Sequence, residues 1–317
     1  MRYRQFGRST MKVSELAFGA MGIAHDPNLK AGVSRSLLYA LEHGVNLIDT
    51  ARIYPGSESI IASTLREWTG AKPGISTKLA SSDRSGFRAG GPVEHYYSEE
   101  GIVRSVDASL RALGVERLDI VHLHQWHYRW THELSWLETL QRLQAEGKVG
   151  LIAVSAQDHE HDALLELVGS SHIDGIQTII NLFESRPMNA LLPHAANAGV
   201  GVIARCVLDS GGLTRVMDDD EFRSITFLKN APAGEYQQRV EQLRAAFIPA
   251  VAPTIASLAM RFALSHPAVS CMALGLAGEA QVKEALDAVE AGSLPAASIE
   301  DIRRHHVWTK NFYERLN

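Results

Sequence analysis

Short apolar runs alternate with longer amphipathic stretches along most of the chain. Apolar runs of about four to eight residues, bounded by polar or glycine-rich turns, are typical of buried strands. Runs of this kind predict eight strands, at residues 14–19, 45–49, 74–78, 118–124, 149–155, 175–180, 201–207 and 269–274.

The stretches between these strands carry apolar residues at helical spacing. Within residues 98–113, one face collects Ile102, Val106, Leu110 and Leu113, which predicts an amphipathic helix. Similar patterns predict helices at residues 34–43, 133–146 and 253–265. Glycine is the residue most often found in the left-handed conformation that ends a helix. The glycines placed to end helices in this way are Gly44, Gly114, Gly147 and Gly199.

Strands that alternate with helices predict a parallel sheet with right-handed crossovers. Eight such units can close into a (β/α)8 barrel, the TIM barrel. The alternative is an open doubly wound sheet, which commonly carries a G-x-G-x-x-G turn after its first strand. The turn Gly19-Ala20-Met21-Gly22 is too short for that motif. We therefore expect one barrel domain over residues 1–317, a length common for single barrels.

Composition narrows the range of partners. A formal net charge of -5, without a basic run, argues against nucleic acid or an anionic membrane as the partner. No apolar run reaches spanning length, and the first residues lack the apolar core of a signal peptide. Cys206 and Cys271 lie in separate apolar runs and are expected to be buried thiols. We expect a soluble, cytoplasmic protein.

Two connections that follow predicted strands are unusually long. Residues 80–98 contain several glycines, and residues 209–237 contain an acidic run at 218–221. Loops after barrel strands lie on the face where barrel enzymes keep their active sites. We therefore expect these long βα loops to shape a site, the alternative being tolerated surface insertions.

Ionisable residues end several of the predicted strands. Asp49 ends the second strand, Lys78 the third and His124 the fourth, and Tyr54 lies in the loop after the second. Parallel strands of a barrel end at one rim, so these side chains are expected to meet there. Each of them alone has a structural explanation, such as a buried ion pair or a core histidine. Their joint occurrence at successive strand ends indicates an active site.

These residue types suit proton transfer to a carbonyl oxygen. A phenol has a reference pKa of about 10, and a nearby ammonium group such as that of Lys78 lowers this value. Asp49 would keep the lysine charged and directed, while His124 would donate a hydrogen bond to the carbonyl oxygen. Hydride addition places negative charge on that oxygen, which the proton of Tyr54 can neutralise. Such a site needs no metal ion.

Motifs around these residues resemble those of the aldo-keto reductases. Residues 44–51 read GVNLIDTA and are followed by Tyr54 and by Ser57-Glu58. Residues 76–78 read STK, and residues 117–124 read RLDIVHLH. Residues 6–9 (FGRS) and 12–19 (KVSELAFG) are similar to the amino-terminal β-hairpin and first strand of that family. The resemblance covers essentially the whole chain.

The resemblance implies a role for each residue of the candidate site. Tyr54 would be the general acid/base, Lys78 and Asp49 the pair that tunes its pKa, and His124 the residue that orients the carbonyl. Tyr54 and His124 would therefore contact the substrate. Trp126 follows His124 closely and is expected to form a wall of the substrate pocket, the alternative being simple packing of a helix onto the barrel.

A nicotinamide cofactor is implied as well. Ser155 and Gln177 match family positions that hold the nicotinamide carboxamide, and Asn181 matches the asparagine of the sixth-strand motif. Other positions that match cofactor contacts follow the first, second, seventh and eighth strands. They are Gly19, Ala20, Met21, Asp49, Arg205, Leu208, Ser210, Gly212, Leu213, Gly275, Ala277, Gln281 and Glu284.

Three positions depart from the family pattern. Ala156 replaces the usual asparagine, and Arg205 stands where many members have an aromatic residue that stacks on the nicotinamide. A planar guanidinium can also stack on a ring. Ala277 replaces the basic residue that pairs with the 2′-phosphate of NADPH. NADP(H) is the cofactor that the family implies, and the missing charge at Ala277 makes NAD(H) the alternative.

Two other functions compete with a carbonyl oxidoreductase. His122 and His124 form an H-x-H pair on one strand face, with His122 deeper in the barrel, and His159 and His161 repeat the spacing. A metal-dependent barrel hydrolase would use such histidines, but the sixth and seventh strands end without a histidine or carboxylate ligand. The other alternative is a non-catalytic, cofactor-binding regulatory subunit, a role known within the family. We expect a NAD(P)H-dependent oxidoreductase that acts on an aldehyde, ketone or sugar-like carbonyl and holds no metal.

Overall fold

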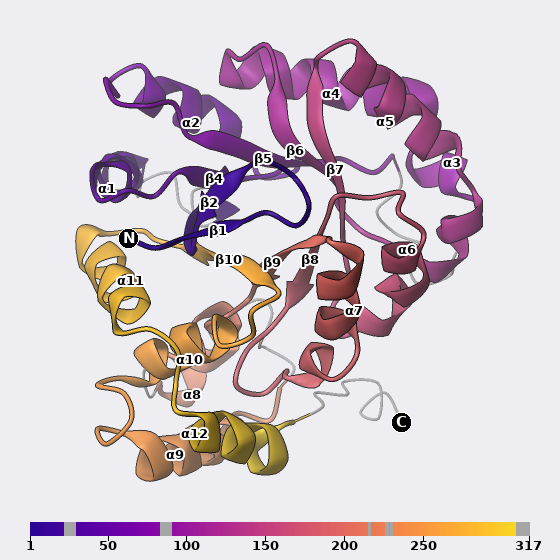
Figure 1. Ribbon diagram of the computed structural model, residues 1–317. Helices are drawn as coiled ribbons and strands as arrows, with labels where there is room; N and C mark the ends of the chain where they lie inside the picture. Colours follow the sequence, from indigo (N-terminus) through magenta and orange to yellow (C-terminus); the bar gives the residue numbers. More distant parts are fainter. Residues whose placement is uncertain (22–29, 83–90, 215–216, 226–227, 229–230, 309–317) are drawn as a thin grey trace.

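The computed structural model describes residues 1–21, 30–82, 91–214, 217–225, 228 and 231–308. Within these residues, parallel strands form a closed barrel in the order β10-β3-β4-β5-β6-β7-β8-β9, which confirms the predicted barrel (Figure 1). Its strands are β3 (Leu16–Gly19), β4 (Leu47–Asp49), β5 (Gly74–Leu79), β6 (Leu118–Leu123), β7 (Val149–Ser155), β8 (Gly175–Ile179), β9 (Gly201–Arg205) and β10 (Val269–Gly275).

Helices surround the barrel wall and connect its strands (Figure 1). The longer ones are α1 (Lys30–Glu42), α2 (Ser57–Leu65), α4 (Glu99–Leu113), α5 (Ser135–Ala145), α7 (Leu191–Ala198), α9 (Ala233–Phe247), α10 (Ile255–Ala263) and α11 (Glu279–Ala291). The shorter ones are α3 (Val93–Tyr96), α6 (Leu165–Gly169), α8 (Asp219–Ser224) and α12 (Ala296–Asp301). Single helical turns are η4 (Tyr128–His132), η5 (His161–Leu164), η6 (Arg186–Met188), η7 (Asp209–Gly211) and η8 (Ile302–His306).

Local signals placed the helix ends well. The side chain of Ser98 accepts a hydrogen bond from the backbone N–H of Gly101 (3.2 Å) and so caps the start of α4. The four glycines that the sequence placed after helices all have positive φ, namely Gly44 (88°), Gly114 (68°), Gly147 (79°) and Gly199 (66°). The predicted glycine caps are therefore confirmed.

The first predicted strand, residues 14–19, is divided between two elements. Its start belongs to an antiparallel hairpin of β1 (Tyr3–Gln5) and β2 (Lys12–Ser14), which confirms the hairpin that the family resemblance implied. The hairpin lies across one end of the barrel (Figure 1). Arg4 ties it there, because its guanidinium donates to the carbonyl oxygens of Leu264 (2.9 Å) and Val269 (2.7 Å).

The core has two apolar layers. A large cluster fills the space between the barrel wall and the helices, and a smaller one fills the bore near the hairpin. The smaller cluster contains Phe6, Leu47, Ile120 and Cys271, all fully buried. The carboxyl end of the bore is instead polar, and this is where the candidate site lies.

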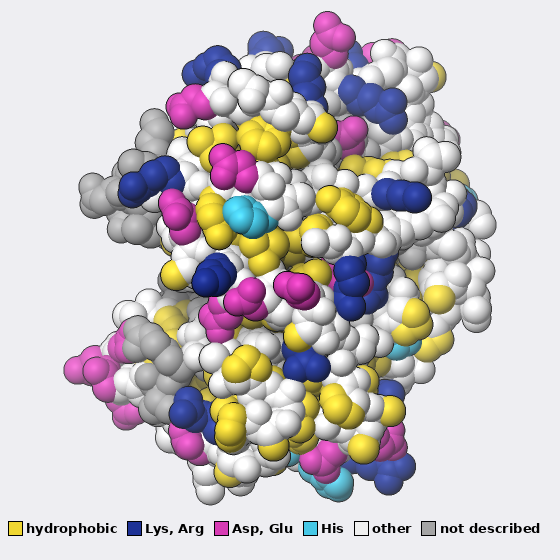
Figure 2. Space-filling model, turned by 60° about the vertical axis from the view of Figure 1, so that its left-hand side comes forward, with side chains coloured by type: hydrophobic (Ala, Val, Ile, Leu, Met, Phe, Trp, Pro, Cys, Tyr) yellow, Lys and Arg dark blue, Asp and Glu magenta, His cyan; other side chains and the backbone are white. Residues whose placement is uncertain are grey.

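The two long connections carry structure of their own. Residues 80–98 include α3, although residues 83–90 lie outside the described part, and residues 209–237 include η7, α8 and the start of α9. Among the described helices, none combines the length and the apolarity needed to cross a membrane. On the face shown in Figure 2, acidic and basic side chains are interspersed, so neither sign of charge dominates that face.

Candidate active site

Four polar side chains that the sequence singled out lie together at the carboxyl end of the barrel. Asp49 ends β4, Lys78 lies in β5, His124 follows β6, and Tyr54 lies between β4 and α2. Lys78 Nζ is 2.6 Å from Asp49 Oδ2 and 5.6 Å from the centroid of the Tyr54 ring. The rings of Tyr54 and His124 meet edge-on, with centroids 5.9 Å apart. Their catalytic roles stay predictions.

The ammonium group of Lys78 is buried and is both paired with a carboxylate and hydrogen-bonded. Its side chain is only 2% exposed, and Nζ donates to Asp49 Oδ2 and to the carbonyl oxygen of Thr50 (2.9 Å). The second oxygen of Asp49, Oδ1, accepts hydrogen bonds from Ser76 Oγ (2.9 Å) and Gln177 Nε2 (3.1 Å). Buried charges are stable only when paired and hydrogen-bonded. This network therefore holds the ammonium group beside the phenol.

The loop that carries Tyr54 is tied to the same strands. The backbone N–H of Arg52 donates to the carbonyl oxygen of Lys78 (3.0 Å). The hydroxyl groups of Thr50 and Ser57 lie 2.7 Å apart and close the loop from the inside. The position of Tyr54 relative to Lys78 is thus set by the backbone and by buried side-chain contacts.

Glu58 anchors the start of α2. Its side chain is buried, and Oε1 accepts hydrogen bonds from Thr77 Oγ1 (3.1 Å) and Ser109 Oγ (2.7 Å). Its other oxygen pairs with Arg52. The motif named Ser57 and Glu58 but not the contacts with Thr77 and Ser109, because these two residues lie on β5 and α4.

The electrostatic surroundings keep the phenol of Tyr54 protonated. Burial raises the pKa of Tyr54 above its usual value of about 10, because a phenolate there would lose its hydration. The charge of Lys78 acts in the opposite direction and Asp49 opposes Lys78. The phenol of Tyr54 therefore stays protonated at neutral pH.

The rim opposite Tyr54 carries the residues expected to hold the nicotinamide. Ser155 ends β7 and pairs in register with Gln177 of β8, and both side chains are buried. Arg205 ends β9. Its Nη2 donates to the carbonyl oxygen of Ala156 (2.9 Å) and to Asp158 Oδ1 (2.8 Å). The two unusual residues, Ala156 and Arg205, are thus in direct contact.

The turn η7 after β9 has an unusual backbone. Asp209, Ser210 and Gly211 have φ values of 47°, 58° and 100°, all in the left-handed region. The Asp209 carboxylate holds the turn, since Oδ2 accepts a hydrogen bond from the hydroxyl of Tyr236 (2.8 Å) on α9. Asn181, which follows β8, donates to the carbonyl oxygen of Cys206 (3.0 Å) at the entry to the turn.

The residues around η7 pack inward. Leu213 is fully buried, and Leu208 packs against the core from a partly buried position. A Cβ at Gly212 would collide with the hydroxyl of Tyr236, so a larger residue would have to displace that ring. Cys206, expected to be buried, lies just after β9 and is only partly buried, whereas Cys271 is buried as expected.

The loop after β10 leads into α11. The backbone N–H of Ala277 donates to Gln281 Oε1 (2.7 Å), so this side chain ties the loop to the first turn of the helix. A Cβ placed on Gly275 or Gly278 would meet no described atom within 4 Å. The backbone of this loop therefore faces open space.

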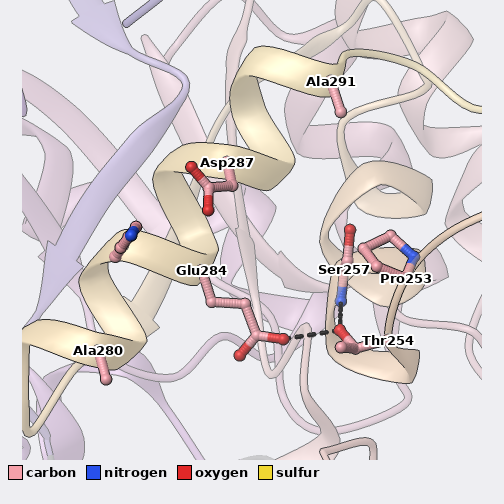
Figure 3. A pocket seen from close by; sticks show the side chains of 8 residues that line it. Pro253, Thr254, Ser257, Ala280, Glu284, Asp287 and Ala291 are labelled. Atoms are coloured by element: carbon pink, nitrogen blue, oxygen red, sulfur yellow. Dashed lines mark hydrogen bonds between the residues drawn. The ribbon is translucent and has the colours of Figure 1, made fainter.

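A groove of about 380 Å³ runs between α10 and α11. Glu284 lies on its α11 side and accepts a hydrogen bond from Thr254 Oγ1 (2.6 Å) across the groove (Figure 3). The lining residues are Pro253, Thr254, Ser257, Ala280, Lys283, Glu284, Asp287 and Ala291.

The end of β3 reaches the same rim. A Cβ at Gly19 would lie 2.8 Å from the carbonyl oxygen of Leu274, so glycine permits the close approach of β3 and β10. The backbone N–H of Ala20 donates to the carbonyl oxygen of Asp49 (2.8 Å). Met21, partly buried, is the last described residue before the gap at 22–29.

Trp126 lies in an aromatic cluster. Its side chain is fully buried, its Nε1 donates to the carbonyl oxygen of Ala163 (3.1 Å), and its ring meets Trp130 and Trp136 edge-on. This position matches the packing alternative. A contact between Trp126 and substrate stays a prediction.

The histidines have separate partners. His122 is fully buried and His124 partly exposed, as the H-x-H spacing predicted. His159 Nδ1 lies 2.7 Å from Glu184 Oε2, and His161 Nε2 lies 3.3 Å from Asp162 Oδ1. In the described part of the chain, no three histidine, cysteine or acidic side chains gather as a metal-binding group.

Residues 15–306 match the family model described as the Aldo/keto reductase family. The chain belongs to this family. Among solved structures, aldo-keto reductase AKR11C1 from Bacillus halodurans (holo form) is similar with a TM-score of 0.78 and 24% identity, covering 98% of this chain and 99% of that one. This likeness shows that the two chains share the fold.

Two curated relatives are distant in sequence. One is a probable voltage-gated potassium channel subunit beta of Arabidopsis thaliana, 25% identical over 92% of this chain and 92% of that protein. Another is the L-galactose dehydrogenase of the same plant, 25% identical over 90% of this chain and 87% of that protein. Family membership supports a general oxidoreductase role.

Proposed function

We propose that this aldo-keto reductase is a NAD(P)H-dependent enzyme that interconverts an aldehyde, ketone or sugar-like carbonyl and the corresponding alcohol. The observation that carries the proposal is the buried Asp49–Lys78 pair, 2.6 Å apart, beside the ring of Tyr54. A buried ion pair with a purely structural role needs no phenol next to it. His124, edge-on to that phenol, completes the set.

The carboxyl rim fits a dinucleotide. Gly211, Gly275 and Gly278 face space in which a Cβ would meet no described atom within 4 Å. Backbone amides in such open, left-handed or helix-start segments suit phosphate groups. Ser155 and Gln177 would hold the nicotinamide end, and Arg205 would face its ring. When bound, this cofactor supplies the hydride.

The residues of the chain would manage the proton. Tyr54 gives its phenolic proton to the carbonyl oxygen as negative charge develops there, and the ammonium group of Lys78 stabilises the phenolate that remains. His124 donates a hydrogen bond that orients the carbonyl. In the direction of alcohol oxidation, the same phenolate takes the proton back.

Glu284 lines the groove between α10 and α11 (Figure 3). We assign the adenosine end of the cofactor to the loop before α11 and the start of this helix, where Ala277, Gln281 and Glu284 lie. NADP(H) remains the first choice because the family implies it. NAD(H) is the alternative, because Ala277 offers no charge to a 2′-phosphate.

The decisive variant is Tyr54→Phe. It removes one oxygen atom and leaves the buried ion pair intact, so we expect turnover to fall by about 100- to 10,000-fold, with cofactor affinity unchanged. NAD(P)H oxidation would be followed with a panel of aldehydes and keto sugars, and cofactor binding by fluorescence. Tyr128→Phe, which alters an exposed phenol, is the matched control. Retained turnover in Tyr54→Phe would exclude Tyr54 as the acid.

A second candidate is a cofactor-binding regulatory subunit, which the channel-subunit relative favours. The two functions differ in one measurement. Stopped-flow mixing of the NADPH-loaded protein with reactive aldehydes oxidises the cofactor if the protein is an enzyme. Tight cofactor binding without oxidation by any carbonyl of the panel would favour the regulatory role.

A further inference from the structure

Two polar side chains lie in the bore of the barrel directly behind Asp49. Ser76 of β5 and His122 of β6 are both fully buried. Leu47 lies two residues before Asp49 on β4, and Ile120 lies two residues before His122 on β6. Both already belong to the smaller apolar cluster in the bore. A buried polar group without a partner costs about 1–3 kcal/mol. The hydrogen bonds of Ser76 and His122 therefore contribute to the stability of the barrel.

These contacts form a directed chain that ends at Lys78. His122 Nε2 lies 3.0 Å from Ser76 Oγ, which lies 2.9 Å from Asp49 Oδ1. A carboxylate only accepts, so the single hydroxyl proton of Ser76 goes to Asp49. Ser76 Oγ can then only accept from His122, which places a proton on Nε2 of that ring. The opposite oxygen of Asp49 holds Lys78.

The imidazole of His122 is neutral. Burial lowers the pKa of His122 to about 3, and the positive charge of Lys78 acts in the same direction, while Asp49 opposes them. A neutral ring donates a hydrogen bond without placing a second cation beside Lys78. A charged ring there would compete with Lys78 for the single carboxylate.

We propose that Ser76 and His122 are positioning residues that hold the Asp49 carboxylate so that the Lys78 ammonium group faces Tyr54. This inference rests on the proposed function, since it gives the pair a part in tuning the proton donor. Gln177 also binds Asp49 Oδ1, at 3.1 Å, so the carboxylate has donors from both sides of the bore. Loss of the Ser76 contact frees the carboxylate to turn, and the ammonium group follows it.

The test compares variants that break the chain with variants that keep it. Ser76→Ala and His122→Leu remove a link, whereas Ser76→Thr and His122→Gln keep a hydroxyl group and an N–H donor. Ser270→Ala removes another buried hydroxyl, one that bonds backbone groups of β9 and the hairpin, and serves as the control. Thermal unfolding confirms that each variant is folded.

The first readout does not depend on activity. Ultraviolet difference titration, in which each protein is subtracted from its Tyr54→Phe counterpart, reports the ionisation of Tyr54 alone. We expect a higher midpoint in Ser76→Ala and His122→Leu, because a displaced ammonium group stabilises the phenolate less. Ser76→Thr and His122→Gln should retain the parent midpoint. Equal midpoints in all variants would overturn the proposal, whether or not the protein turns over any carbonyl.

The second readout is catalysis. We expect kcat to fall about 10- to 100-fold in the two broken variants, as when groups behind a catalytic residue are removed, with KM for the carbonyl and the Kd of the cofactor unchanged. A parent protein without turnover contradicts the proposed function, not the positioning role. A loss in His122→Gln as large as in His122→Leu would show that His122 only fills space.

Discussion

Lys78 carries a full charge in a place that water hardly reaches, and its neighbours are arranged around that charge. Asp49 Oδ2 and the carbonyl oxygen of Thr50 accept from Nζ at 2.6 and 2.9 Å. Removing one partner of a buried pair leaves the other unpaired, at a cost of about 3–5 kcal/mol. Changes at Asp49 or Lys78 therefore affect folding and chemistry together, which makes Tyr54→Phe the cleaner test of the chemistry.

At the same scale, the residue at position 277 is expected to set the preference for NADPH or NADH. In Ala277→Arg, a guanidinium is available to pair with a 2′-phosphate. We expect the Kd for NADPH to fall by about 10-fold, which corresponds to about 1.4 kcal/mol, with the Kd for NADH unchanged. Ala296→Arg, at the exposed start of α12, is the matched control for added charge. Equal changes for both cofactors would show that position 277 does not read the phosphate.

At the scale of elements, helices outside the barrel hold the loops of its rim. The turn η7 keeps Asp209, Ser210 and Gly211 in left-handed conformations, which cost about 1–2 kcal/mol for each residue other than glycine. The hydrogen bond from Tyr236 on α9 to Asp209 offsets part of that cost. The geometry of the expected pyrophosphate loop thus depends on α9, a helix outside the barrel.

Tyr236→Phe tests this dependence. The variant removes one hydroxyl and leaves the buried Asp209 carboxylate with one donor fewer, so we expect a loss of about 1.5–3 kcal/mol in stability and several-fold weaker dinucleotide binding. Urea unfolding and fluorescence titration measure the two effects. Tyr97→Phe alters another buried phenol, which bonds backbone near Gln125, and is the control. Lower stability with unchanged cofactor affinity would contradict the role of α9.

At the scale of the whole molecule, folding keeps His122 from binding a proton. Its pKa is lowered to about 3 by burial, from about 6.5 in an unfolded chain. Between these values the unfolded state binds more protons than the folded state, so stability falls as the pH is lowered through this range. The barrel is therefore expected to be acid-sensitive from pH 6.5 downward.

We expect His122 to contribute a loss of about 1.4 kcal/mol for each pH unit below 6.5. Urea unfolding at pH 7.5 and 5.5 measures it, in the parent protein and in His122→Gln. The variant should lose less stability between the two values, because glutamine does not titrate. Carboxylates with lowered pKa values, such as Glu184 at about 2, act only at lower pH. An unchanged pH dependence in His122→Gln would contradict this account.

Much of this architecture follows from local pattern. The apolar runs predicted the strands, the positions of glycines predicted the helix ends, and the strand ends predicted that Asp49, Lys78 and His124 share a rim. Parallel strands of a barrel all end on the same side, so a position within each strand suffices to place such residues. The residues of the candidate site can therefore be predicted from the sequence. The H-x-H spacing likewise predicted that His122 lies deeper in the barrel than His124.

Only the tertiary structure decided which side chains form hydrogen bonds with one another at the site. Asp49 bonds Ser76 and Gln177, which lie 27 and 128 residues further along the chain, and Arg205 bonds Asp158. Such contacts depend on strand register and side-chain rotamers, which a pattern of apolar and polar positions does not encode. The sequence by itself determined which groups reach the rim. The closed barrel decided which of these groups form hydrogen bonds or ion pairs with one another. Closure brings strands from distant parts of the chain within hydrogen-bonding distance.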